Sequence, residues 1–421
     1  MLVFPTLYPT HLTIAIDAIC VSPIFLCPYF AEFVALSSVG TKINQTWEGI
    51  MRAHLQIFCC VALLFSVAGY AQSVGDITSV AGTGLVGFSG DGGLSISAKL
   101  ANPRGVGLDK AGNFYIADTA NNRIRKVNIS NYMITTVAGS GKAGFCGDGG
   151  AATSACLTQP SGVAVDSAGN LYIADNGNSR IRKVDTSGKI TTYAGDGTPT
   201  FCGDGLPATQ ACLHTPTGVA VDTKGNVYVA EYFSGRIRKI LASNHTITTV
   251  AGNGAMGSSG DGGPAIFAEL NGPTGVAVDA SGNIYIAEWG GNFVRQVNPS
   301  GIISTLAGNG NPMFCGDGGA AASACLRLPW AVAVDGSGNV FIADSGNSRI
   351  RKVTASTKKI SSVAGGGNTG GSTIGDNGPA TSARLYVPYG VAVLPTTVAS
   401  TAKSLYIADS GNTRVRRVTL Q

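Results

Sequence analysis

The sequence predicts an all-β protein, a six-bladed β-propeller with four short antiparallel strands in each blade. From residue 77 onward one unit recurs six times, at steps of 56 or 57 residues and a last step of 65. Each unit holds four short strand candidates separated by clusters of turn residues. The first strand candidate, 77–82, precedes the first complete unit, and the last unit lacks its fourth strand. We therefore expect strand 77–82 to complete the sixth blade and to close the ring.

The composition agrees with a folded β protein. Charged residues make up only 13% of the chain, and 59 of its 421 residues are glycine. So little charge excludes most disordered and coiled-coil proteins. Aromatic residues are 7%, so the core must consist largely of Val, Ile, Ala and Gly, which favours closely packed strands. The net charge of +5 is mild and dispersed, and we expect no nucleic-acid partner.

The unit at 134–184 and the strand after it illustrate the four strands in order. The stretch GVAVD (162–166) has only small residues, which suits the crowded centre of a propeller, and LYIAD (171–175) follows after the turn 167–170. RIRKV (180–184) alternates apolar and basic residues, as a half-exposed strand does. After the turn 185–188, ITTYAG (190–195) forms the outermost strand.

The repeated motifs P-x-G-V-A-V-D, G-N-x-Y-I-A-D and N-x-R-I-R-K-V resemble NHL repeats, which form six-bladed propellers. The additional G-D-G-G-x-A-x-x-A-x-L segment resembles the NHL propeller of teneurins and of secreted bacterial NHL proteins. The resemblance covers about residues 77–418. It implies the fold but leaves function open, because such propellers serve in protein binding, RNA binding, sensing and occasionally as lyases.

Residues 51–71 have the pattern of a secretory signal peptide. Arg52 and His54 precede an apolar stretch at 55–68, and Gly69 and Ala71 are small residues at the cleavage positions. We therefore expect export from a start at Met51, a propeller over 72–421 that is not inserted in the membrane, and a secreted or periplasmic location. Residues 1–50 are interpreted as disordered upstream sequence included by mistake, because the codons of 47–50 resemble a bacterial ribosome-binding site; a genuine extension is the alternative.

Six of the ten cysteines form three pairs at the same place in three blades, and the other three blades change both positions together. Paired presence and absence predicts disulfide bonds, because no His or second C-x-x-C motif lies in these loops to support a metal site. The expected bonds are Cys146–Cys156, Cys202–Cys212 and Cys315–Cys325.

One face should carry the long G-D-G-G loops and the loops after Y-I-A-D, and long loops on a rigid scaffold usually hold binding residues. On that face the repeat pattern breaks in four consecutive blades, where aromatic residues and two glutamates appear. The candidate ligand site comprises His214, Glu231, Tyr232, Phe233, Glu288, Trp289, Phe293, Trp330 and Tyr389. Aromatic rings would stack on a sugar or peptide and the glutamates would accept hydrogen bonds. The alternative is that these rings fill gaps left by missing Asn and Arg side chains, or meet a neighbouring domain.

Other recurring residues are interpreted as structural. The G-D-G aspartates, such as Asp91, should satisfy backbone N–H groups in their turns, with calcium binding as the alternative. Asp118 and its equivalents should pair with the arginine five residues later, and the Arg125 series should be scaffold or solvated surface.

The predicted function is an exported, non-catalytic binding or scaffold propeller that recognises a protein or an extracellular polysaccharide on the long-loop face, with no cofactor. Only His214 and His245 remain after signal removal, which gives little support to catalysis. The alternative is a secreted metal-dependent lyase or hydrolase with its site at the central channel.

Overall fold

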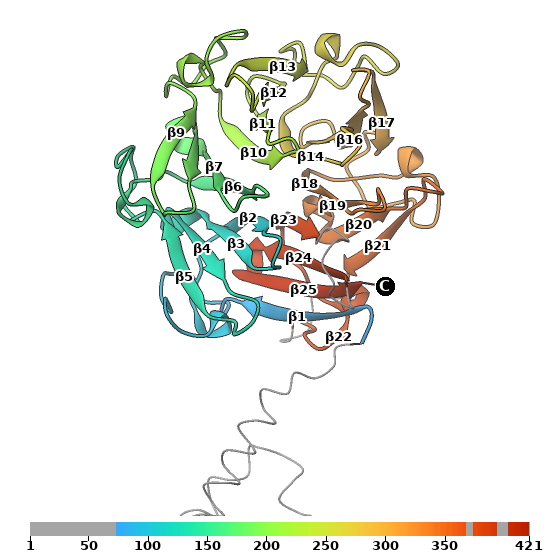
Figure 1. Cartoon of the computed structure of the whole chain (residues 1–421). Helices are drawn as coiled ribbons and strands as arrows, with labels where there is room; N and C mark the ends of the chain where they lie inside the picture. Colours follow the sequence, from blue (N-terminus) through green and yellow to red (C-terminus); the bar gives the residue numbers. More distant parts are fainter. Residues whose placement is uncertain (1–72, 368–373, 394–402, 421) are drawn as a thin grey trace, which may run out of the picture. The chain divides into compact units, whose positions relative to one another are not determined.

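The computed structural model describes residues 73–367, 374–393 and 403–420. They form six antiparallel sheets arranged as blades around one axis, and the innermost strands β2, β6, β10, β14, β18 and β23 surround the centre (Figure 1). The predicted six-bladed propeller is confirmed. The expected boundaries at 1–50 and 51–71 lie outside the described residues.

Each of the first five blades is a four-stranded meander. Blade one comprises β2 (Pro103–Leu108), β3 (Phe114–Asp118), β4 (Arg123–Val127) and β5 (Ile134–Ala138), and blade two β6 (Pro160–Val165), β7 (Leu171–Asp175), β8 (Arg180–Val184) and β9 (Ile190–Ala194). Blade three comprises β10 (Pro216–Val221), β11 (Val227–Glu231), β12 (Arg236–Ile240) and β13 (Ile247–Ala251). Blade four comprises β14 (Pro273–Val278), β15 (Ile284–Glu288), β16 (Phe293–Val297) and β17 (Ile303–Ala307), and blade five β18 (Pro329–Val334), β19 (Val340–Asp344), β20 (Arg349–Val353) and β21 (Ile360–Gly365).

The sixth blade joins the two ends of the propeller. Its strands are β23 (Pro388–Val393), β24 (Lys403–Asp409), β25 (Arg414–Leu420) and β1 (Asp76–Ala81), with the two-residue β22 (Gly378–Pro379) outside β1. Strand β1 pairs antiparallel with β25, with Ile77 opposite Val418 (Figure 1). The predicted closure by the first strand is confirmed, one residue earlier than the expected bounds.

Short 3-10 turns occupy two places in the repeat. The first set lies in the long loops: η1 (Ser95–Ser97), η3 (Ala152–Ser154), η5 (Ala208–Gln210), η6 (Ala265–Phe267), η7 (Ala321–Ser323) and η9 (Ala380–Ser382). The second set follows the second strand of four blades: η2 (Thr119–Asn121), η4 (Asn176–Asn178), η8 (Ser345–Asn347) and η10 (Ser410–Asn412). Among the described residues no helix is long and apolar enough to cross a membrane.

Apolar side chains form the core between neighbouring blades. In one such layer Ala174 and Ile181 of blade two pack with Val219 and Val229 of blade three. Near the axis the blades approach so closely that a Cβ on Gly105 would lie 2.6 Å from the carbonyl oxygen of Ser161. A glycine is therefore required there, which explains the small residues of the innermost strand.

A buried arginine in the third strand holds each blade together. In blade one Arg125 is fully buried and contacts two carboxylates, Asp118 at 3.3 Å and Asp91 at 2.7 Å. The same arrangement recurs in all six blades, with Arg182, Arg238, Arg295, Arg351 and Arg416. The long loop is thereby tied to the end of the second strand. Of the two expected roles for this arginine series, the structure shows the scaffold role.

Two details of the predicted framework were wrong. The Asp118 series pairs with the arginine seven residues later, not five, because Arg123 stacks on Phe88 and donates to the backbone oxygen of Ser140. The partners of the G-D-G aspartates lie outside their own turns: Asp91 accepts from Arg125 and from the hydroxyl of Thr136 on the outermost strand. Both corrections follow from the length of arginine, which lets it reach between loops.

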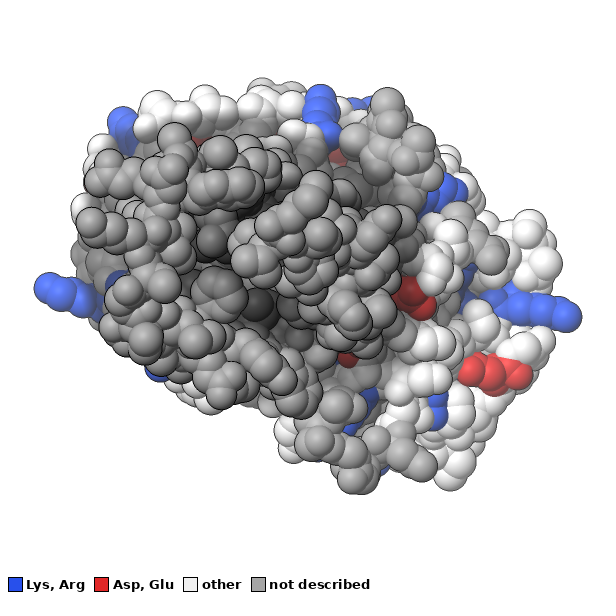
Figure 2. Space-filling view, turned by 90° about the horizontal axis from the view of Figure 1, so that it is seen from below, with Lys and Arg blue, Asp and Glu red and all other residues white. Residues whose placement is uncertain are grey.

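The three expected disulfides are present, with Cα–Cα distances of 4.9, 4.8 and 4.8 Å. Blades without a disulfide hold the same loop by hydrogen bonds. In blade four the Ser259 hydroxyl donates to Glu269 at 3.1 Å, and in blade one Lys99 N donates to the Ser89 hydroxyl at 3.2 Å. On the described surface visible in Figure 2, charged side chains lie scattered among uncharged ones.

Candidate binding site on the long-loop face

The long loops and the loops after the second strands lie side by side, as predicted. In blade three Tyr232 N donates to the backbone oxygen of Thr215, and in blade four Trp289 N donates to that of Gly272. The first strand of each blade begins on this face with Pro-x-Gly or, in blade five, Pro-x-Ala. A register shift leaves residue x out of the ladder, and such bulges re-aim a side chain.

Apart from Phe293, the predicted aromatic residues divide into two groups, of which the first joins blades three and four. The Tyr232 ring lies 4.8 Å from that of Phe233 and 5.9 Å from that of Trp289, and the His214 ring lies 5.3 Å from Phe233. We call these four residues the outer aromatic cluster. Phe233 is 55% exposed, and the other three are partly exposed.

A local change in the chain places this cluster. Blades three and four have no 3-10 turn after the second strand, where four other blades have one. Gly272 of blade four has φ +60°, and a Cβ there would lie 2.9 Å from the Tyr232 ring. The glycine thus leaves space for a tyrosine from the neighbouring blade, and the aromatic side chain lies across the junction.

Glu231 and Glu288 lie beneath this surface and belong to the framework. Both are fully buried, and they contact Arg238 at 3.1 Å and Arg295 at 2.9 Å. Burial raises the pKa of both carboxyls, and the charge of the adjacent arginine opposes that shift. The expectation that they accept hydrogen bonds from a ligand was wrong, because framework groups occupy them.

Their extra length compensates for shorter neighbours. In blade two Asp175 accepts from the side chain of Asn178 at 2.7 Å. Blade three has Ser234 at the equivalent position, and Glu231 reaches its hydroxyl at 3.1 Å. In blade four, where Gly291 offers no side chain, Glu288 accepts from Ser258 at 2.5 Å.

Phe293 also has a packing role and makes no ring contact with the outer aromatic cluster. Four of the other blades place an arginine at its position and stack it on a phenylalanine of the long loop, as Arg236 stacks on Phe201 with 3.8 Å between Cζ and the ring centroid. In blade four Phe293 replaces the arginine of the strand, and Ser258 replaces the phenylalanine of the loop. For Phe293 the space-filling alternative agrees better with the structure.

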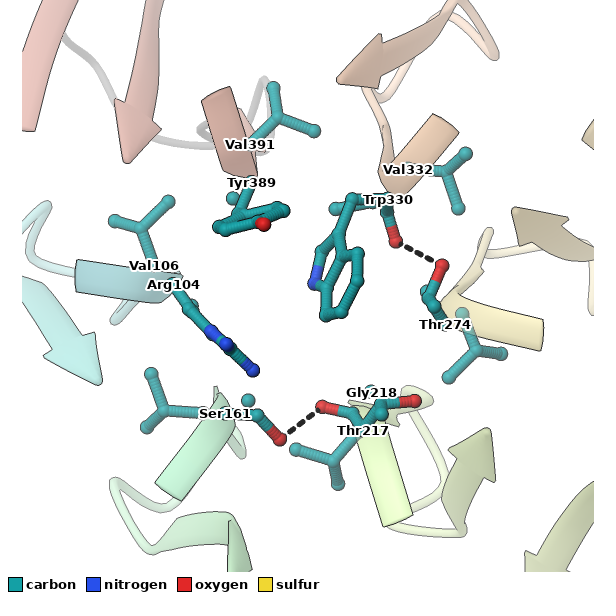
Figure 3. Close-up of a pocket in the computed structure, with 18 residues that line it drawn as sticks. Arg104, Val106, Ser161, Thr217, Gly218, Thr274, Trp330, Val332, Tyr389 and Val391 are labelled. Carbon is teal, nitrogen blue, oxygen red and sulfur yellow. Dashed lines mark hydrogen bonds between the residues drawn. The ribbon is translucent and has the colours of Figure 1, made fainter. Parts of the chain in front are cut away.

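The second group lies at the mouth of the central channel. The rings of Trp330 and Tyr389 lie 4.5 Å apart, and the guanidinium carbon of Arg104 lies 5.5 and 5.4 Å from their centroids. All three side chains line a cavity of about 80 Å³ on the axis (Figure 3). Sequence reasoning missed Arg104, although it occupies the same Pro-x-Gly position as Tyr389; a comparison by side-chain size, not only by aromaticity, would have found it.

Neither predicted histidine lies in a metal-ligand group. His214 packs on Phe233, whereas His245 packs on Tyr193, with 4.4 Å between ring centroids. Within 73–367, 374–393 and 403–420, no group of three or more His, Cys, Asp or Glu side chains is placed to hold a metal ion.

The repeating framework, with its G-D-G loop tied to a buried arginine, matches a known family. The model of the teneurin NHL domain matches residues 87–144, 141–201, 196–259 and 254–314, and the NHL repeat model matches 326–353. The chain belongs to the NHL-repeat proteins of the teneurin type. The resemblance seen in the repeated motifs is thereby confirmed.

Similar proteins include Teneurin-4 of Mus musculus, which is 33% identical over 279 residues. That match covers 57% of this chain and 10% of the relative, so this NHL propeller corresponds to a small part of the teneurin. Two solved structures from Bacteroides thetaiotaomicron share the fold. One, a protein of unknown function, has a TM-score of 0.59 and 16% identity, over 82% of this chain and 75% of that one.

The other solved structure is that of an auxiliary nutrient binding protein. Its TM-score is 0.58 with 15% identity, and the match covers 81% of this chain and 75% of that one. At such identity the likeness concerns the fold alone.

Proposed function

We propose that this NHL propeller is an exported, non-catalytic binding module that recognises a protein or an extracellular glycan on its long-loop face. The observation that carries the proposal is a break in symmetry. The arginine framework is the same in all six blades, whereas aromatic side chains gather on one face of blades three to six. Framework needs do not account for an exposed ring such as Phe233.

Aromatic rings suit a binding surface in a protein with few charges. Trp and Tyr offer a large apolar area and a hydrogen-bonding group at low cost in side-chain entropy. The three disulfides support export, because such bonds persist in oxidising compartments. A nutrient-binding protein among the structures that share the fold is in keeping with a binding role.

The test is binding of the purified protein to an array of defined glycans and to a panel of purified extracellular proteins. We expect the variant Phe233→Ala/Trp289→Ala to lose roughly thirtyfold in affinity, about 2 kcal/mol for removal of an aromatic anchor, with an unchanged melting temperature. The matched control is Phe267→Ala, because Phe267 is 71% exposed and lies outside the outer aromatic cluster. Equal binding by the double variant, or a wild-type protein that retains nothing, contradicts the proposal.

A further inference from the structure

The mouth of the central channel is a ring of six equivalent side chains with two unlike halves. These side chains belong to the second residue of each first strand, the x of Pro-x-Gly or Pro-x-Ala, and they point toward the axis (Figure 3). Three members are small hydroxyl residues from blades two, three and four: Ser161, Thr217 and Thr274. The other three, Arg104, Trp330 and Tyr389, are large and come from blades one, five and six. All six side chains line the cavity of about 80 Å³.

Arg104 has no anionic partner among the described residues. Each of the six framework arginines contacts two carboxylates, but no ion pair or hydrogen bond forms at the Arg104 side chain, and its buried Nε has no acceptor. Burial lowers the pKa of Arg104, and the nearby Tyr389 opposes this shift. The rings of Trp330 and Tyr389 stabilise the cation from the side, yet its N–H donors remain open toward the cavity.

The same half of the ring offers two further donors. Within the described residues, neither the indole N–H of Trp330 nor the phenol O–H of Tyr389 makes a hydrogen bond, and both side chains extend toward the centre (Figure 3). A guanidinium, an indole and a phenol converging on one small space favour an acceptor with negative charge, and a carboxylate matches the planar guanidinium.

The opposite half offers acceptors. The hydroxyl of Ser161 donates to the backbone oxygen of Thr217 at 2.9 Å, and that of Thr274 donates to the backbone oxygen of Trp330 at 2.7 Å (Figure 3). Each proton is used, so the hydroxyl oxygens present lone pairs. A ligand with a carboxylate on one side and hydroxyl donors on the other matches both halves.

We propose that the channel mouth binds the carboxylate of an acidic saccharide, namely a uronic-acid residue whose ring lies against Trp330 and Tyr389. This proposal rests on the proposed binding function and specifies its ligand chemistry. The cavity holds a carboxylate but not a whole sugar ring, so the body of the ligand lies outside, on the long-loop face. A peptide C-terminus fits less well, because proteins usually capture it with backbone N–H groups, and here the donors are side chains.

The experiment compares glucuronate with glucose, which differ only in the carboxylate, by ligand-observed NMR titration of the purified protein. We expect glucuronate to bind at least about tenfold more tightly than glucose, since a hydrogen bond to a charged group contributes that much. Arg104→Thr should abolish the difference. This substitution places in blade one the residue that blades three and four already have, so the variant should fold.

Four results overturn the inference. The first two are absence of saturable glucuronate binding and equal binding of glucuronate and glucose. The others are a preference that survives Arg104→Thr, and tighter binding of N-acetylglycine than of glucuronate, which would assign the site to a peptide terminus. The proposed function fails separately, through the Phe233→Ala/Trp289→Ala variant on the array. Arg104→Lys serves as a control: it keeps the charge without the planar fork and should retain a reduced preference.

Discussion

At the level of single residues, each blade holds one arginine and one carboxylate in its interior, although the chain carries little charge. Arg238, for example, is fully buried between Asp204 and Glu231, at 2.6 and 3.1 Å. Buried ions are costly to desolvate, and removal of one partner leaves an uncompensated charge. The framework arginines therefore hold these carboxylates in place. Arg104, which has no carboxylate partner among the described residues, is available to bind a ligand.

Because several tyrosines are buried, we expect the free energy of unfolding to fall at alkaline pH. Burial raises the pKa of Tyr406 to about 12. It also raises that of Tyr285, whose hydroxyl donates to Asp279 at 3.0 Å, and those of Tyr115, Tyr172 and Tyr228. The pKa of tyrosine in an unfolded chain is about 10. The folded state therefore keeps protons that the unfolded chain releases, and this stability is present below about pH 10 and is lost as the pH rises further.

Ultraviolet titration of the phenols alongside thermal melting checks this expectation. A group of tyrosines should ionise late and together with unfolding. Tyr285→Phe should lessen the alkaline loss without harm to the fold, because blade five has Phe341, fully buried, at the equivalent position. Ionisation of all tyrosines near pH 10 with an unchanged melting temperature would refute it.

At the level of elements, the long loops lie beside the loops that carry the outer aromatic cluster and need support of their own. In blade three the Cys202–Cys212 bond closes a loop with a sequence separation of 10 residues. We expect Cys202→Ser/Cys212→Ser to lower the free energy of unfolding by about 2–3 kcal/mol, mainly because the unfolded chain gains freedom. Denaturant-induced unfolding followed by circular dichroism measures the change.

The fold itself should survive that substitution. Blade four shows the loop without a disulfide, held by the hydrogen bond from Ser259 to Glu269. Binding at the outer aromatic cluster should persist in the variant at temperatures below its melting point. A variant that fails to form the native sheet content, or one whose stability does not change, would show that this account of the loop is wrong.

At the level of the whole molecule, repetition made the ring predictable. The period located the four strands of each blade, and the unpaired strand at one end matched the missing strand at the other, as the pairing of Ile77 with Val418 confirms. The site was harder to predict, because the length of each side chain decides whether its polar group is buried in the framework or exposed at the surface. Glu231 was expected at the surface, but its extra methylene compensates for Ser234 in place of asparagine and keeps the carboxylate buried.

Arg104 illustrates the other limit of sequence reasoning. Its position in the repeat is clear, but from the sequence alone an arginine with small neighbours in a strand cannot be distinguished from a solvent-exposed arginine. Only the ring of six first strands shows that it lies beside Trp330 and Tyr389, with no carboxylate partner among the described residues (Figure 3). Blades one, five and six come into contact only because the propeller ring closes. The sequence of a single repeat gives no information about these contacts.

The central claim is that one face of an otherwise regular ring binds the partner. Hydroxyl-radical footprinting of the protein, with and without a ligand retained on the array, tests it most directly. We expect protection of Phe233, Trp289, Trp330 and Tyr389, with unchanged reactivity of the turns at 109–113 and 166–170 on the opposite face. Protection of those turns, with the four aromatic residues as reactive as in the free protein, would contradict the account.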